Sequence, residues 1–149
     1  MQYPDAAASV ARGTRAMLGL TLRSLGPTLE TVTLPQWRVL ALVHRVERVR
    51  QVDIAEAMDV SAPTVTRMIE RLVTKGLLTR ATSAQNRRES EITLTTPGRQ
   101  LVMDALERRM DAVSALLDSL DVEEQQALAR AAELITSRLE AEIDPALDL

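Results

Sequence analysis

The chain has 149 residues, a formal net charge of −3 and a hydrophobic fraction of 46%, values that are typical of one globular domain with a substantial core. It contains no cysteine, one histidine and only two aromatic residues, Tyr3 and Trp37, which excludes disulfides and thiolate metal ligands and disfavours base stacking on single strands. No apolar run has the length of a membrane span and the first ten residues carry no secretory pattern, so we expect a cytoplasmic protein without membrane contact.

The first third of the chain predicts two helices. Apolar residues recur at steps of three and four from residue 5 to residue 25, the pattern of an amphipathic helix. Gly26-Pro27 is expected to end or kink this helix, because proline lacks a backbone donor and crowds the preceding turn. Residues 33–36, Thr-Leu-Pro-Gln, have the form of a capping box with proline in the first turn and open the second helix. For residues 47–50 we expect a turn or a very short strand.

Residues 51–75 predict two helices joined by a tight turn. The first covers residues 51–58, and Asp59-Val60 forms the turn. Ser61 is expected to cap the second helix by accepting hydrogen bonds from its first amides. This helix runs to Lys75, and Gly76 is a natural stop. The apolar face that would fix it to the protein consists of Val65, Met68, Ile69 and Leu72.

The pattern then changes to strands and back to helices. Residues 77–81 and 90–95 predict a β-hairpin whose connection, residues 82–89, is polar and basic. A long helix opens at residues 96–98, Thr-Pro-Gly, and a last helix opens at Asp121 and ends before residue 145. The sequence therefore predicts a mainly α fold with a small β-hairpin.

Basic residues are concentrated in one part of the chain. Between Ser61 and Arg99 there are seven lysine and arginine residues and three glutamates, so this segment carries +4 and the rest of the chain −7. A basic segment on an acidic body is the electrostatic pattern of a nucleic-acid-binding surface.

The helix that follows Ser61 has a polar face opposite its apolar one, centred near Arg67. Such a helix can place short hydroxyls and an arginine on base edges in the major groove, while its first amides meet a phosphate. The basic loop can reach a neighbouring groove. Each feature alone is typical of a solvated surface, but their order along the chain favours binding of double-stranded DNA. The candidate DNA-binding residues are Ser61, Pro63, Thr64, Thr66, Arg67, Arg71, Arg87 and Arg88.

These segments resemble the MarR family of winged helix-turn-helix transcriptional regulators. The resemblance covers residues 34 to 98, and the flanking helices agree with the family only in pattern and length. The segments that carry it are Leu34–Leu40, Ile54-Ala55, Val60-Ser61, Thr64–Leu72, Lys75–Arg80, Asn86-Arg87-Arg88, Leu94-Thr95 and Gly98.

The resemblance implies one domain over residues 1–149, with a winged helix-turn-helix lobe at 33–98 and dimerisation helices at 1–32 and 99–149. It implies a homodimer, most often a repressor, that binds a palindromic operator. It also implies release by a small aromatic or anionic effector, and no cofactor. A winged-helix module that binds proteins and has no DNA affinity is the alternative, which the acidic body allows.

Arg88 matches the wing-tip arginine that enters the minor groove in this family. The family usually has aspartate where this chain has Asn86. Since an amide offers only a neutral hydrogen bond in place of a charge-assisted one, the tip is expected to be looser or held in another way.

Trp37 and His44 share a face of the second helix, because they lie seven residues apart. They are candidates for lining an effector pocket, although the favoured explanation is an ordinary core tryptophan and a partly buried histidine. With a single histidine and no cysteine, a metal site is not expected. No nucleophile–base pair or phosphate-binding loop is visible, so the sequence gives no sign of an enzyme.

Overall fold

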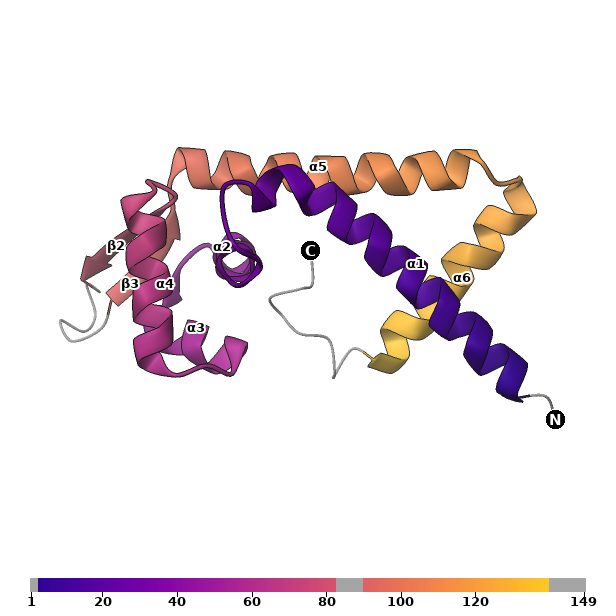
Figure 1. Ribbon diagram of the computed structural model, residues 1–149, viewed down its shortest axis with the longest axis horizontal. Helices are drawn as coiled ribbons and strands as arrows, with labels where there is room; N and C mark the ends of the chain where they lie inside the picture. The colour runs from indigo at the N-terminus through magenta and orange to yellow at the C-terminus, as the bar shows by residue number, and fades with distance from the viewer. Residues whose placement is uncertain (1–2, 83–89, 140–149) are drawn as a thin grey trace.

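The computed structural model describes residues 3–82 and 90–139, which form helices and a small antiparallel sheet that lies at one end of the molecule (Figure 1). Within these residues the mainly α fold with one hairpin is confirmed. The elements are α1 (Tyr3–Leu29), α2 (Leu34–Val46), β1 (Val49–Arg50), α3 (Gln51–Met58), α4 (Ala62–Thr74), β2 (Leu78–Thr82), β3 (Ser90–Leu94), α5 (Thr96–Asp118) and α6 (Val122–Leu139).

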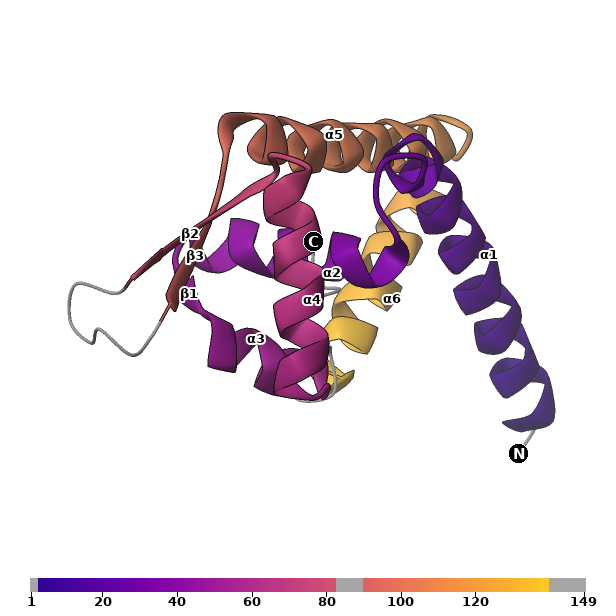
Figure 2. The same cartoon turned by 60° about the vertical axis from the view of Figure 1, so that its left-hand side comes forward.

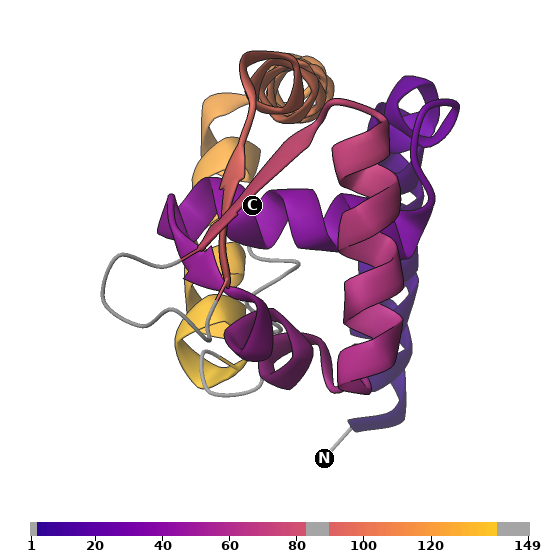
Figure 3. The ribbon, with the colours of Figure 1, turned by 90° about the vertical axis from the view of Figure 1, so that its left-hand side faces the viewer.

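Helix α2 is the centre of the core. It begins at the predicted capping box, in which the Gln36 amide nitrogen donates to the Thr33 hydroxyl and the Thr33 amide donates to the Gln36 side chain. Helices α3 and α4, the sheet and the first turns of α5 surround it (Figure 3). The largest fully buried side chains of this core are Val32, Val39, Leu40, Val43, Ile54, Val65, Ile69, Leu72, Leu78, Ile92 and Val102.

The end of α1 differs from the prediction. We expected Gly26-Pro27 to end or kink the helix near residue 25, but α1 includes Pro27 and ends at Leu29. The reason is a distant arginine: the guanidinium of Arg108 on α5 donates to the Ser24 carbonyl at 3.1 Å and to the Thr28 hydroxyl at 2.6 Å. Pro27 removes one backbone donor near the end of the helix, and Arg108 holds this last part of α1 through two bonds to other acceptors.

The sheet has the strand order β1-β3-β2 and is antiparallel throughout. The very short strand expected near residue 49 is β1, whose Val49 pairs with Ile92 on β3. Ile92 is fully buried, as its alternation with polar neighbours predicted. Strands β2 and β3 project from the helices beside α4 (Figure 2). Their predicted basic connection lies outside the described residues.

Gly98 lies where α5 starts against the beginning of β2. A Cβ atom at residue 98 would overlap the carbonyl oxygen of Leu77. Only glycine therefore allows the backbone of α5 to approach β2 this closely. The long helix is thus joined directly to the winged lobe.

Helices α1, α5 and α6 extend away from this lobe (Figure 1). Helix α1 packs along α5, whereas α6 has no buried side chain. Within the described residues, no helix is long and apolar enough to cross a membrane. The exposed large apolar side chains of these three helices are Val10, Met17, Leu18, Leu22, Met103, Met110, Val122, Leu128, Leu134, Ile135 and Leu139.

Replacing Gly98 by alanine tests the close approach. We expect Gly98→Ala to destabilise the protein by about 2 kcal/mol, because backbone must move to admit the methyl group. Gly13→Ala is the matched control: Gly13 lies in α1 with nothing within 4 Å of an added Cβ, and alanine favours a helix. Urea unfolding at equal protein concentration measures both. A Gly98→Ala midpoint equal to that of the unchanged chain contradicts this account.

Candidate nucleic-acid interface

Helix α4 is held with its polar face outward. Val65, Ile69 and Leu72 are fully buried, and Met68 packs half-buried beside them, so the predicted apolar face is confirmed. Since a helix turns 100° per residue, burial of this face leaves Arg67 exposed on the opposite side. The remaining candidates on the outer side of α4 are Ser61, Pro63 and Arg71, which are exposed, and Thr64 and Thr66, which are half-buried.

Ser61 stands at the N-cap of α4, but its side chain makes no capping hydrogen bond, so that prediction is wrong. The second helical residue is Pro63, which has no amide hydrogen to donate. The amide of the third, Thr64, donates instead to the Ser61 carbonyl at 2.9 Å. The two hydroxyls of Ser61 and Thr64 lie 2.9 Å apart and bond each other.

Thr66 ties α4 to α3 and does not project freely outward. Its hydroxyl donates to the Ala62 carbonyl at 2.9 Å and accepts from the Gln51 side-chain amide at 2.6 Å. The Gln51 carbonyl oxygen is buried without a hydrogen-bond partner in the described part of the chain. This geometry gives Thr66 a positioning role for the angle between the two helices.

A charged pair fixes the start of α3. Both oxygens of Asp53 accept from the Arg50 guanidinium, at 2.8 and 2.6 Å. This hydrogen bonding holds the pKa of Asp53 below its ordinary value, against the small opposing effect of burial. The pair is solvent-exposed, so it orients the β1–α3 corner more than it stabilises the fold.

A groove of about 500 Å³ runs between the outer face of α4 and the N-terminus of α2. Arg67, Arg71 and Lys75 repeat every four residues along one side of it, a spacing that is visible in the sequence. The contribution of α2 is not visible there, because no local pattern joins residues so far apart along the chain. The groove is lined by Thr33, Gln36, Arg67, Glu70, Arg71, Thr74 and Lys75.

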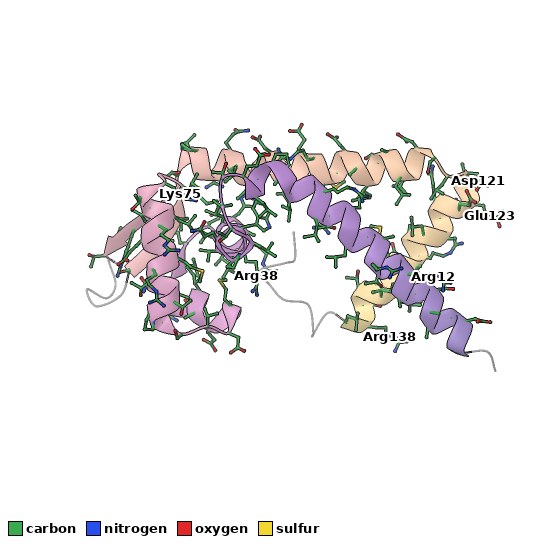
Figure 4. All side chains as sticks on the ribbon, viewed as in Figure 1. Arg12, Arg38, Lys75, Asp121, Glu123 and Arg138 are labelled. Carbon is green, nitrogen blue, oxygen red and sulfur yellow. The ribbon has the colours of Figure 1, made fainter. Side chains whose placement is uncertain are left out.

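Lys75 closes one end of this groove. Its ammonium group donates to the Thr31 carbonyl in the α1–α2 connection and lies 3.5 Å from the Gln36 side-chain oxygen. Figure 4 shows Lys75 at the end of α4 nearest α5. The sequence marks Lys75 as the end of the helix and as one of the basic residues, and its role as a tether to the α1–α2 connection comes from the structure.

Several predicted residues are not placed in the groove. Arg87 and Arg88 lie outside the described residues, as does Asn86. At the base of the wing, the Arg80 guanidinium donates to Ser90 across the two strands at 3.0 Å.

Among the described residues, no three histidine or acidic side chains gather in a way that could hold a metal ion.

Trp37 and His44 both lie on α2, as expected. Trp37 is only 4% exposed and belongs to the hydrophobic core. The Nδ1 atom of His44 is buried without a hydrogen-bond partner in the described part of the chain. The tryptophan thus has the packing of a core residue, and the histidine carries the unsatisfied polar atom.

Comparisons with known proteins agree with this geometry. Residues 32–90 match the model of the MarR family. The uncharacterized HTH-type transcriptional regulator YfiV of Bacillus subtilis (strain 168) is 28% identical over 125 residues, which make up 81% of this chain and 78% of YfiV. The chain is thus similar to an HTH-type transcriptional regulator over most of its length.

Solved structures share the fold over nearly the whole chain. RV1404 from Mycobacterium tuberculosis has a TM-score of 0.85 at 23% identity and covers 92% of this chain and 94% of its own. YusO from Bacillus subtilis has a TM-score of 0.72 at 28% identity, over 89% and 94%. A mutant of MepR from S. aureus, bound to an oligodeoxyribonucleotide, has a TM-score of 0.70 at 25% identity, over 90% and 97%.

Replacing Thr66 by valine tests its positioning role. We expect Thr66→Val to lower the free energy of unfolding by about 1–2 kcal/mol, because the Gln51 amide loses its partner in a partly buried site. Thr74→Val is the control, since that hydroxyl bonds only the Glu70 carbonyl of its own helix and is exposed. Denaturant unfolding measures both variants. Equal losses in the two would assign Thr66 no special role.

Proposed function

We propose that this chain is a transcriptional regulator of the MarR family, which represses transcription as a homodimer bound to a palindromic operator in double-stranded DNA. The observation that carries the proposal is the outward polar face of α4, with Arg67 at its centre and a basic groove beside it. An exposed helix of this size fits the major groove. MepR, one of the structural relatives, is bound to an oligodeoxyribonucleotide.

The two halves of α4 have different tasks in this proposal. The N-terminal half carries Pro63, Thr64 and Arg67 toward base edges, where one bidentate arginine discriminates guanine. The C-terminal half carries Arg71 along the groove toward the DNA backbone. The N-terminus of α2 opens on the same groove, and the positive end of its dipole favours a phosphate there.

The wing is proposed to add a second contact. Strands β2 and β3 project from the helices beside α4 (Figure 2) and are joined in the sequence by the basic connection predicted for residues 82–89. Arg87 and Arg88 belong to this connection. An arginine at a wing tip suits a narrow minor groove, where the negative potential is enhanced.

Dimerisation is proposed to occur through α1, α5 and α6. Helix α6 buries none of its side chains within the chain, yet it carries an apolar stripe that includes Leu128 and Ile135. An exposed apolar surface of this extent marks an interaction site. A two-fold pair of recognition helices then matches the symmetry of a palindromic operator.

Release by a small aromatic or anionic ligand is the regulatory part of the proposal. His44 is the better of the two candidate residues, because a ligand group could satisfy its buried Nδ1 atom, whereas a ligand at Trp37 would have to displace core packing. As the single tryptophan, Trp37 reports binding on α2 through its fluorescence. If anions release the DNA but leave the Trp37 emission unchanged, the effector binds elsewhere.

Two arginine variants separate base contacts from phosphate contacts. We expect Arg67→Ala to cost roughly 1–3 kcal/mol on the operator and to relax sequence preference. Arg71→Gln should weaken operator and random DNA alike and lower the salt slope by about one unit. Fluorescence anisotropy over a salt series, with the DNA upstream of the gene, measures both.

Arg12→Gln is the control for this experiment, because Arg12 lies on α1 far from the winged lobe (Figure 4). It should change neither affinity nor slope. Equal losses for Arg67→Ala on operator and random DNA would make Arg67 a phosphate contact and remove its role in base recognition.

A charge on α6 tests the dimer. We expect Ile135→Lys to shift the protein from dimer to monomer in sedimentation velocity, since it places an unpaired ammonium group in the proposed interface. Val52→Lys is the matched control, because Val52 is also an exposed β-branched apolar residue but lies on α3 in the winged lobe. A monomeric parent chain, or an Ile135→Lys variant that sediments as a dimer, would contradict the interface.

A further inference from the structure

The threonine of the Leu94-Thr95 motif joins three elements through one side chain. The Thr95 hydroxyl accepts from the Gly98 amide at 3.0 Å and thereby caps α5. The same hydroxyl donates to the Gly76 carbonyl at 2.6 Å, just beyond the end of α4. The Thr95 amide donates to the Leu77 carbonyl at 3.1 Å, where β2 begins.

Backbone geometry makes this junction narrow. Gly76 has a φ of +71°, so the chain reverses there from α4 toward β2 in a conformation that other residues rarely adopt. On the other side, Gly98 leaves no room for a side chain against Leu77. The end of α4 and the start of α5 are therefore held together at the hydroxyl of Thr95, without an intervening side chain.

A small rotation at this junction produces a large displacement at the other end of α4. Helix α4 has 13 residues, a length of about 20 Å, so a rotation of roughly 10° at Gly76 moves its far end by about 3 Å. The base contacts proposed above lie at that far end, near Pro63 and Thr64. A hydrogen bond to a base edge does not survive a displacement of that size.

We propose that Thr95 is a positioning residue for DNA recognition, which fixes the direction of α4 relative to α5. The inference rests on the proposed function, because it assigns to the dimerisation helix α5 the placing of the recognition helix. Lys75 also holds the end of α4, because its ammonium group donates to the Thr31 carbonyl. The charge of Lys75, however, faces the groove. Thr95 is uncharged, so its effect on direction can be measured without removing a phosphate contact.

A distance measurement tests the role of this junction directly. The chain has no cysteine, so spin labels can be attached at Ala62→Cys, at the far end of α4, and at Glu107→Cys on α5, both exposed sites. Doubly labelled chains are diluted with unlabelled ones, and the electron–electron distance within one chain is recorded. We expect Thr95→Val to broaden this distribution, and Thr95→Ser, which keeps the hydroxyl, to restore it.

DNA binding gives the second measurement. We expect Thr95→Val to weaken operator binding on the order of tenfold, with random DNA and the salt slope little changed, because the loss is one of alignment. Thr79→Val is the matched control: it removes a wing hydroxyl that bonds only Thr93 across the strands at 2.7 Å. This control and Thr95→Ser should bind like the parent chain.

The outcomes separate the two proposals. If the parent chain binds no duplex DNA, the proposed function is wrong. The distance distribution still decides whether Thr95 sets the direction of α4. A Thr95→Val distribution as narrow as that of the parent overturns the inference. So does an equal loss of affinity on operator and random DNA, which indicates a general defect.

Discussion

Burial of Val65, Ile69 and Leu72 is the constraint on which the rest of the interface depends. All three side chains of α4 are fully inaccessible to solvent and pack in the core around α2. Successive residues of a helix are turned by about 100° around its axis, so burial of one face determines the direction of every other side chain. Arg67 must then point outward, and Arg71 and Lys75 must flank the N-terminus of α2. The chemistry of the surface follows from the packing beneath it.

Local patterns in the sequence predicted the elements well, since each depends on neighbouring residues. The capping box at Thr33, the apolar face of α4 and the burial of Ile92 needed only periodicity and cap chemistry. The failures came from interactions that these patterns omit. The Ser61 cap failed because the Thr64 amide donates to the Ser61 carbonyl and the Ser61 hydroxyl bonds that of Thr64, and the length of α1 depended on Arg108, 80 residues beyond Thr28.

The groove shows the same limit for the site. Its cations follow a helical repeat that the sequence displays, but Thr33 and Gln36 reach it from α2 through tertiary packing. Thr66 shows the same limit: its helical position places it at the flank of the polar face, and only the structure adds its bond to Gln51 on α3. Helix α5 links these features to the rest of the molecule, since Val102 and Ala105 belong to the core of the lobe while Met110, farther along, is exposed.

The central claim is that the outward face of α4 recognises duplex DNA as part of a symmetric dimer. Titration of the chain onto duplex DNA from the region upstream of its own gene, followed by anisotropy and by the mass of the complex, tests it most directly. The account predicts a saturable complex of one dimer per site, at least about a thousandfold tighter than random duplex at the same salt concentration. Absence of any complex at low salt would contradict it and would favour a winged-helix module that binds proteins instead.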